Sequence, residues 1–586
     1  MDGKILDPLD FYLSEARDGH RQNAQALFER HLEDSGLDAD DNQRLAEAYD
    51  ASAAEYKSLK DSKTCRVLLG CLAGLLIAIG IALIAVFREG AAYPVVGVLL
   101  LIPSCIWLFG RIIPEFRDLK QRTLEKYEES EKLLLPPKEQ LELLDRTFEP
   151  GEGLRLFEQT VPDFRFFDYC SAEHQALMER CDFSAAADRD SSVTDTLAGT
   201  YRGNPYLFTT VLHHTMCDRV YTGSKTIYWQ EEERQQVRKE RSITDSDGSS
   251  RTETYYEWEY VTVDKEETLK AEVTAPAPCY SRESSLAYGH HAAPDLCFSR
   301  RPKHIQKKSE ERVRARVARK SHALRSKSEQ AVLAGQQYVM MANEEFEVLF
   351  GASDRNNDHQ FRVLFTPQAQ KNMVALLKDS TLIGDEFFFR KAGRCSIIPC
   401  DGRVFGESPR HYHDYSVQEA RKNYLNHQQE YFRSLFGIFS PLLAITGYQE
   451  PAPPMPGLDV AGHFASWEHE AAANHFPLPL LVTDDCRTEA VLKTKLIGTT
   501  EKADIVEVTA SAYTAKNRVE TFRMLGGDGS YHDVDVDWVE YIPRTKVTAI
   551  SIEALSDEAQ ERLGQSGGIR YRGLYARIME QHKEES

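Results

Sequence analysis

Residues 66–116 read RVLLGCLAGLLIAIGIALIAVFREGAAYPVVGVLLLIPSCIWLFGRIIPEF, and this stretch decides how the chain is organised. It holds two apolar runs, separated by the short connection REGAAYP at 88–94. Each run has roughly the twenty residues needed to cross about 30 Å of hydrocarbon, and the connection is too short to hold a domain. The sequence therefore predicts a two-pass transmembrane hairpin, with the lipid bilayer as a partner.

Positive charge flanks the spans on the side of the chain ends. The cations before the first span and around the end of the second are Lys57, Lys60, Lys63, Arg66, Arg111, Arg117, Lys120 and Arg122. The connection offers only Arg88, which Glu89 offsets. Because cytoplasmic flanks are enriched in Lys and Arg, we expect both termini in the cytoplasm. The first 60 residues contain no apolar run typical of a signal peptide, so the first span is expected to direct insertion.

The spans carry small residues but no acidic residue and no lysine, so a proton relay or ion pathway has no candidate group there. Gly70, Gly74, Ala78 and Ala82 recur every four residues and form one smooth stripe on the first span. Such a stripe lets another helix backbone approach closely. We favour packing against the second span, and a homo-oligomer through the first span is the alternative.

The bulk composition excludes some functions. A chain of 586 residues has room for about three or four domains. The net charge of −20 argues against non-specific nucleic-acid binding. The cysteines number 11 and include no C-x-x-C pair, which is typical of reduced thiols and not of a disulfide framework or zinc ribbon.

The pattern along the chain predicts an α+β protein. We divide it into a cytoplasmic helical segment (1–63), the transmembrane hairpin (64–116), a helical stalk (117–160), an α+β domain (161–447) with a basic insert (300–327), a Pro-rich linker (448–458) and a C-terminal antiparallel β-rich domain (459–586).

Several local patterns set boundaries. Pro136 and Pro137 are expected to end the stalk helix, and Gly203-Asn204 predicts a tight hairpin. Residues 225–233 and 252–263 predict a second strand pair across the turn-rich TDSDGSS. The Pro- and His-containing stretch 274–295 is expected to be a loop.

The stretch 300–327 is strongly basic and contains Arg312, Arg314, Arg316, Arg319 and Lys320. We favour a solvated linker, or a helix paired with the acidic surface of this chain. Contact with the anionic cytoplasmic leaflet is the alternative, since each cation near such a surface contributes about 1 kcal/mol. Nucleic acid is less favoured.

The stretch 340–445 predicts a compact α+β unit. Residues 344–350 (EEFEVLF) and 360–365 (QFRVLF) are expected to be strands, and Thr366-Pro367 to begin a helix. Residues 386–399 predict a strand pair around Ala392-Gly393. Ser416 and Glu419 predict a capping box for a long helix that ends near Pro441.

These features together resemble a family of bacterial two-pass membrane proteins of unknown function. The residues that carry the resemblance are Glu345, Phe346, Val348, Phe350, Arg362, Leu364, Phe365, Thr366, Pro367, Leu376, Phe387 and Phe388. The resemblance covers 60–445 loosely and 340–400 more clearly. It implies a bacterial inner-membrane location, and it implies no reaction, substrate or cofactor.

Motifs for catalysis or metal binding are weak. Residues 564–568 (GQSGG) match G-x-S-x-G, but a nucleophile elbow needs a strand before it and a helix is expected there. We therefore favour a glycine that ends this helix. His463, His469 and His475 are six residues apart, and on a helix they would point to three different sides. Asp533, Asp535 and Asp537 alternate with apolar residues, as in a half-buried strand. We expect no cofactor.

His411 and His413 could place two imidazoles on one strand face, but no third metal ligand is evident. The sequence therefore favours a non-catalytic, membrane-anchored scaffold or sensor-like protein that faces the cytoplasm. One alternative is an enzyme with a dispersed or metal-dependent site that uses these histidines. The other is an anionic-lipid-binding or envelope-stress module that uses the basic insert.

Overall fold

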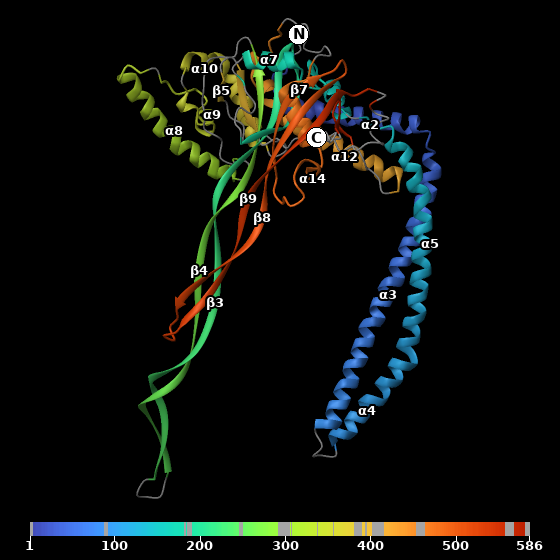
Figure 1. Cartoon of the computed structure of the whole chain (residues 1–586), viewed down its shortest axis with the longest axis vertical. Coiled ribbons are helices and arrows are strands. Elements are labelled where there is room, and N and C mark those ends of the chain that lie inside the picture. The colour runs from blue at the N-terminus through green and yellow to red at the C-terminus, as the bar shows by residue number, and fades with distance from the viewer. Residues whose placement is uncertain are drawn as a thin grey trace, which may run out of the picture.

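The chain forms a head from which two long extensions project in the same direction (Figure 1). The computed structural model describes residues 4–86, 92–149, 151–180, 183, 190–244, 250–290, 305, 308–336, 338–355, 357–379, 390–392, 395–400, 415–452, 463–556, 559 and 568–579. One extension is helical and the other is a pair of β-ribbons. The mixture of helices and antiparallel sheets confirms the α+β class.

The helical extension follows α1 (Pro8–Phe11), the π-helical turn η1 (Tyr12–Ala16) and α2 (Arg17–Ser35), which ends at the left-handed Gly36. Helix α3 (Ala39–Val86) continues from the polar N-terminal segment into the first apolar run. The chain returns through α4 (Ala92–Trp107), the π-helical turn η2 (Leu108–Ile112) and α5 (Ile113–Asp145). Two of these helical stretches are long and apolar enough to cross a membrane, which suggests a membrane protein.

The two apolar helices meet at Gly80 and Gly97. A Cβ atom on Gly97 would lie 2.8 Å from the carbonyl oxygen of Gly80, so only glycine fits at this approach. The predicted stripe of small residues is not at this contact. Its members Gly74, Ala78 and Ala82 are exposed, and a Cβ on Gly74 would meet nothing within 4 Å. The contact with α4 is therefore made by a different face of α3 from the one that the four-residue spacing singled out.

The expected helix end at Pro136 and Pro137 is wrong, because α5 continues through both prolines to Asp145. A proline inside a helix leaves one carbonyl of the preceding turn without its N–H partner. Lys132, four residues before Pro136, is exposed, so water can hydrate that carbonyl. Asn42 of α3 donates to the carbonyl of Pro137 (3.2 Å), which fixes the two helices to each other here.

The first sheet has the strand order β1-β2-β3-β4-β6-β5. Its strands are β1 (Phe164–Phe166), β2 (Ser191–Tyr201), β3 (Asn204–Thr244), β4 (Ser250–Gly289), β5 (Arg390–Ala392) and β6 (Cys395–Cys400). The predicted hairpin is confirmed: Tyr201 pairs with Asn204, and Arg202 and Gly203 form the two-residue turn at positive φ. The predicted strand pair 225–233 and 252–263 lies within β3 and β4.

The expected loop at 274–295 is wrong for residues 274–289, because β4 continues to Gly289. Pro276 and Pro278 pair across from Asp218 and Met216 of β3. Strand β6 covers the other edge of β4 only from Ser284 to Gly289. Both prolines thus lie where β4 is an edge strand, and a missing N–H is tolerated there.

The second sheet has the order β10-β11-β9-β8-β7. Its strands are β7 (Val491–Thr499), β8 (Ala503–Leu525), β9 (Tyr531–Ala554), β10 (Ile569–Tyr571) and β11 (Leu574–Ile578). The long hairpins of the two sheets pack together through the buried side chains of Ile227, Leu269, Val534 and Val536. Backbones come very close at Gly223, where a Cβ would lie 2.1 Å from the carbonyl oxygen of Asp535.

The two stretches 344–350 and 360–365 are helical, so the prediction of strands is wrong. The first stretch forms α9 (Glu344–Leu349), and the second forms most of α10 (Asp358–Leu364). Between them lies the short 3-10 helix η3 (Ala352–Asp354). Asn343 and Asn357 cap the two helices, since their side chains accept from the amides of Phe346 and Gln360. An asparagine cap begins a helix by satisfying a free N–H, and these caps override the alternation of apolar residues.

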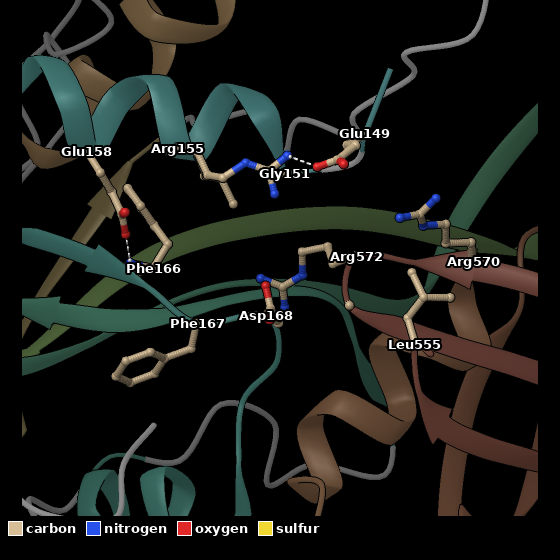
Figure 2. A pocket seen from close by; sticks show the side chains of 12 residues that line it. Glu149, Gly151, Arg155, Glu158, Phe166, Phe167, Asp168, Leu555, Arg570 and Arg572 are labelled. Carbon is tan, nitrogen blue, oxygen red and sulfur yellow. Dashed lines mark hydrogen bonds and ion pairs between the residues drawn. The ribbon is translucent and has the colours of Figure 1, made fainter. Parts of the chain in front are cut away.

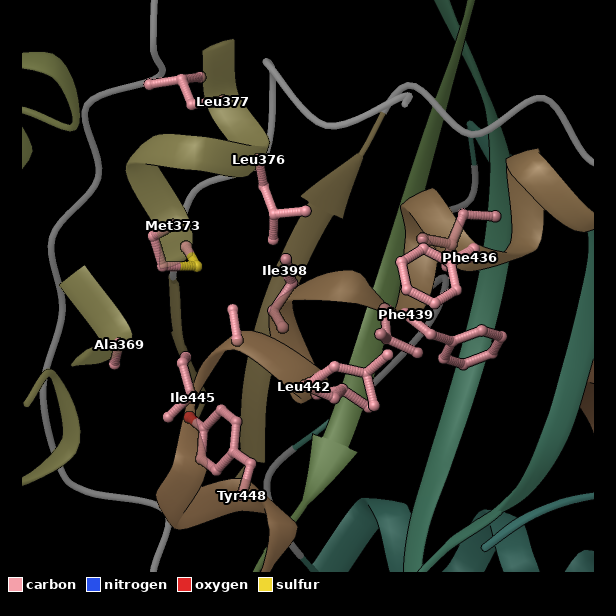
Figure 3. Packing of buried hydrophobic residues seen from close by; sticks show 14 of the residues in the cluster. Ala369, Met373, Leu376, Leu377, Ile398, Phe436, Phe439, Leu442, Ile445 and Tyr448 are labelled. Carbon is pink, nitrogen blue, oxygen red and sulfur yellow. The ribbon is translucent and has the colours of Figure 1, made fainter. Parts of the chain in front are cut away.

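The next two helices are confirmed. In α11 (Pro367–Lys378) the Thr366 side chain accepts from the amide of Ala369, as an N-cap should. Helix α12 (Val417–Ala444) begins after Ser416 and continues past Pro441 to Ala444. Its start differs from the predicted capping box, because the Ser416 side chain accepts from the amide of Gln418 and the Glu419 carboxylate pairs with Lys422. Figure 3 shows α11, α12 and β6 packing around Met373, Leu376, Ile398, Phe439 and Leu442.

The remaining helices are α6 (Glu152–Thr160), α7 (Ala172–Arg180), α8 (Glu310–Leu333), η4 (Thr446–Gln449), α13 (Ser466–Asn474) and α14 (Leu478–Leu481). Helix α13 packs between the two sheets. One buried cluster contains Val193 and Leu207 of the first sheet, Trp467 of α13 and Val506 of the second sheet. Residues on both sides of the Pro-rich stretch therefore share a hydrophobic core.

Candidate functional site

A pocket of about 340 Å³ lies where the chain leaving the stalk meets the two sheets (Figure 2). It is lined by Glu149, Gly151, Leu154, Arg155, Glu158, Phe166, Phe167, Asp168, Leu555, Arg570, Arg572 and Gly573. Residues 149–158 follow α5 almost directly, 166–168 lie at and just after β1, and 555–573 belong to the second sheet and its connections. The pocket thus joins three parts of the chain.

One wall is the beginning of α6. Gly151 takes a left-handed conformation (φ 78°) and precedes the first helical residue, Glu152. The Glu152 carboxylate accepts from the amide of Glu149 (2.5 Å), and the Glu149 carboxylate in turn accepts from Nη2 of Arg155 (2.7 Å). Free N–H groups and the helix dipole make such a helix start weakly electropositive.

Arg572 forms the floor of the pocket, from the tight turn between β10 and β11. It is held at positive φ (48°), which is uncommon for a residue with a side chain. Its Nη2 atom donates to Oγ1 of Thr196 (2.7 Å) and to Oε1 of Glu468 (3.0 Å). Its Nε and Nη1 atoms are buried and have no hydrogen-bond partner in the described part of the chain. The described residues therefore leave the hydrogen-bonding capacity of two nitrogens of this guanidinium unmet.

A buried network fixes Arg572 from below. Oε2 of Glu468 accepts from the amide of Cys170 (3.0 Å) and from the hydroxyl of Thr196 (2.6 Å). The hydroxyl of Tyr571 donates to Asp195 (2.7 Å). The network ties α13, β2 and the turn between β10 and β11 together, so the guanidinium is held in place before any ligand arrives.

The network also keeps Arg572 charged. Burial alone would lower the pKa of Arg572, but the neighbouring Tyr571, Glu468 and Asp195 outweigh it and raise that pKa. Burial raises the pKa of the Asp195 carboxyl, although Arg572 opposes this shift. The cation at the floor of the pocket therefore persists across the whole pH range in which the head is folded.

The lining carries charged and apolar side chains that suit a small charged ligand. It combines three arginines with three carboxylates, and Glu149 pairs with Arg155 at the rim. Phe166, Phe167 and Leu555 add apolar surface. A planar guanidinium with free donors suits a small carboxylate or phosphate.

His411 and His413 lie outside the described residues, as do Phe387, Phe388 and most of the GQSGG stretch. Within the described residues no group of three or more His, Cys, Asp and Glu side chains could hold a metal ion. His463 and His469 both approach the carboxylate of Asp504 (3.6 and 3.0 Å), while the ring of His475 is tilted against that of Tyr571, with centroids 4.1 Å apart.

The expectation for the three histidines is corrected in one respect. Only His469 lies within α13, and His463 precedes that helix, so helical spacing does not apply to the pair. Asp533, Asp535 and Asp537 are exposed on β9 between the buried Val534 and Val536, which confirms the half-buried strand.

The basic insert forms α8 from residue 310 onward, with Val313 and Ser321 buried against the head. Arg312, Arg314, Arg319 and Lys320 are exposed, and Arg316 is half-buried. Arg314 pairs with Glu310 of its own helix (2.5 Å). In Figure 1, α8 lies on the head, whereas the tips of α3 and α4 point away from it. Contact of these residues with the anionic cytoplasmic leaflet stays a prediction.

The pocket was missed because its residues are scattered over more than 400 positions. One signal in the sequence points to it: Tyr-Arg-Gly occurs at 201–203 and again at 571–573. Both copies form two-residue hairpin turns with arginine at positive φ. Arg202 pairs with Asp163 (2.9 Å), and the amide of Gly573 donates to the carbonyl of Asp168 (3.3 Å). The segment 163–168 therefore joins both turns.

Comparison of the chain with protein-family models, with curated proteins and with solved structures found no match.

Proposed function

We propose that this chain is a membrane-anchored, sensor-like scaffold of a bacterial inner membrane, with both termini and the head in the cytoplasm. In this proposal the pocket above Arg572 binds a small anion, a carboxylate or a phosphate. The observation that carries it is the pair of buried, unpartnered donors Nε and Nη1 of Arg572. A buried donor without a partner costs about 1–3 kcal/mol, and an anionic ligand would remove that cost.

The position of the pocket supports a sensor. A bound anion would contact the start of α6, which follows the stalk, and the turn between β10 and β11. Ligand binding would therefore strengthen the connection between the membrane anchor and the second sheet. A ligand shifts a conformational equilibrium only through such differential contacts.

The β-ribbon supports a scaffold. Strands β3 and β4 contain 41 and 40 residues, and a ribbon of that length extends on the order of 130 Å. Beyond its contact with β8 and β9 it exposes the aromatic side chains of Tyr256, Trp258 and Tyr260 on one face. Exposed aromatic residues are typical of surfaces that bind partners.

Thermal unfolding of the full-length protein in detergent tests the pocket, with inorganic phosphate and succinate as probes. We expect at least one probe to raise the melting temperature in a saturable way. Arg572→Gln removes the free donors, and Arg155→Gln removes a rim cation while leaving the buried network intact. Both variants should bind the probe at least about tenfold more weakly, the loss of about 1.4 kcal/mol that one charged hydrogen bond supplies.

The matched control is Arg518→Gln, whose side chain pairs with Glu540 on the ribbon of β8 and β9; neither residue lines the pocket. This variant should bind the probe like the unsubstituted protein. If neither anion shifts the melting temperature, or if Arg155→Gln and Arg518→Gln bind equally well, the pocket is not an anion site.

A further inference from the structure

A second hollow lies between α3 and α5, next to the apolar runs. It measures about 530 Å³ and is lined by Tyr56, Lys63, Arg117, Lys120, Gln121, Thr123, Leu124 and Tyr127. Lys63 precedes the first apolar run, and Arg117 follows Phe116 at the end of the second. The hollow therefore lies at the level where the head groups of the cytoplasmic leaflet would be.

An ion pair marks the membrane side of the hollow. Arg66 of α3 and Glu115 of α5 approach to 2.9 Å and join the two helices. Lys63 is three residues before Arg66, and thus about one helical turn closer to the head. The ion pair fixes the two walls relative to each other, so the hollow belongs to a rigid pair of helices.

The cations around this boundary fall into two groups. Arg111, Arg122 and Lys126 each pair with a carboxylate, namely Glu115 (3.1 Å), Asp118 (3.0 Å) and Glu129 (2.9 Å). The side chains of Lys63, Arg117 and Lys120, which line the hollow, form no ion pair or hydrogen bond within the described part of the chain. The three cations that line the hollow thus have no internal counter-charge among the described residues.

The lining also has an amphipathic part. The rings of Tyr56 and Tyr127 contact each other across the two helices, with centroids 5.7 Å apart. Leu124 adds exposed apolar surface beside them. Tyrosines and cations side by side are typical of the membrane interface, where a ligand is charged at one end and apolar at the other.

We propose that this hollow binds the head group of an anionic phospholipid of the cytoplasmic leaflet. Lys63, Arg117 and Lys120 contact the phosphate, and Tyr56, Tyr127 and Leu124 contact the glycerol and the first acyl carbons. Basic pockets between helices on the cytoplasmic side bind lipid head groups in this way. The proposal rests on the bilayer placement in the proposed function, and it is independent of the anion pocket in the head.

Native mass spectrometry of the full-length protein in detergent tests the proposal, with dioleoylphosphatidylglycerol as the probe and dioleoylphosphatidylcholine as the neutral comparison. We expect phosphatidylglycerol to bind at least about tenfold more tightly than phosphatidylcholine. The triple variant Lys63→Gln, Arg117→Gln and Lys120→Gln should weaken the binding of phosphatidylglycerol by about 100-fold, because three cations at about 1 kcal/mol each are lost and 1.4 kcal/mol corresponds to tenfold.

The matched control is the triple variant Arg111→Gln, Arg122→Gln and Lys126→Gln, which removes the same charge from cations that are already paired. It should change binding by less than about threefold, since paired surface cations contribute little. Equal losses in the two triple variants, or equal binding of the two lipids, would overturn the site. Tight binding of free glycerol phosphate would also overturn it, because the hollow would then be a site for a soluble phosphate and not for a lipid.

Carbonate extraction of membranes separates this proposal from its premise. A chain that stays in the membrane pellet but shows no lipid preference contradicts only the lipid site. A chain that is extracted into the supernatant contradicts the bilayer placement itself.

Discussion

Arg355 and Glu347 form an ion pair that is almost completely buried, with Nη1 2.8 Å from Oε1 and side chains 1% and 0% exposed. Arg355 also donates to the carbonyls of Ala352 and Val339, and its guanidinium lies over the rings of Tyr338 and Phe361. Every donor has a partner here, in contrast to Arg572 in the pocket. This pair is structural and holds α9 and α10 together.

Breaking that pair should be costly. Arg355→Met leaves the Glu347 carboxylate buried without its partner, which costs about 3–5 kcal/mol of unfolding free energy. The control is Arg325→Met, which breaks an ion pair with Glu344 at the surface and should cost less than about 1 kcal/mol. Chemical unfolding of the full-length protein measures both. Equal losses in the two variants would contradict the structural role of Arg355.

The head should lose stability in mild acid because of buried neutral histidines. Burial lowers the pKa of His20 from 6.5 to about 4, although the Gln428 carbonyl opposes this shift. Below pH 6.5 the unfolded chain binds a proton that the folded chain does not, so stability falls between about pH 6.5 and pH 4. For a shift of this size the loss reaches about 3 kcal/mol.

His20→Gln removes this titrating group and keeps a side-chain amide near Gln428. Its melting temperature should therefore fall less steeply between pH 7 and pH 4.5 than that of the unsubstituted protein. The exposed His322 on α8 provides the control, since His322→Gln should leave the slope unchanged. A parallel pH profile for His20→Gln and His322→Gln would show that His20 does not contribute.

The contact between the apolar helices should depend on Gly97 and not on the Gly74 stripe. Valine at position 97 would place its Cβ 2.7 Å from Cγ1 of Ile84, so the helices would have to separate. Overpacking of this kind costs about 1–3 kcal/mol. Gly74→Val meets open space and should leave unfolding in micelles unchanged. The reverse order of the two variants would contradict the packing.

The ribbon of β3 and β4 should stay outside the bilayer, although it runs in the same direction as α3 and α4 (Figure 1). Acidic residues outnumber basic ones between 230 and 264, and its distal edges are unpaired. Such a ribbon cannot enter hydrocarbon, where unpaired backbone groups cost several kcal/mol each. We therefore predict that the ribbon stays in water when α3 and α4 are in a membrane.

Tryptophan quenching measures this directly, in liposomes that contain lipids brominated deep in the acyl chain. In single-tryptophan variants, Trp107 of α4 should be quenched and Trp258 of the ribbon should not. Quenching of Trp258 as strong as that of Trp107 would place the ribbon inside the membrane and contradict this orientation.

Much of the fold could be predicted because its signals are local. The apolar runs of α3 and α4, the turn at Gly203 and the cap at Thr366 each depend on a few neighbouring residues. The errors arose where tertiary contacts or caps override a local pattern. The alternation of Phe346, Val348 and Phe350 is compatible with a short buried helix as well as a strand, and periodicity over so few residues cannot separate the two.

The candidate site could not be predicted, because it depends on long-range packing. Arg572 and Glu468 are about a hundred residues apart, and Thr196 and Glu149 lie far earlier in the chain. No spacing rule connects such residues, and a buried, unpartnered donor is visible only in three dimensions. The repeated Tyr-Arg-Gly turn was the only local hint, and its meaning depends on the partners of each arginine.

The central claim is that the α3 and α4 hairpin anchors the chain with its head in the cytoplasm. Alkaline-phosphatase fusions test it most directly, because this reporter is active only outside the cytoplasm. One fusion is placed at Gly90 in the connection between the apolar runs, and one after Ser586. We predict an active fusion at Gly90 and an inactive one at the C-terminus. An active C-terminal fusion with an inactive fusion at Gly90 would contradict the claim.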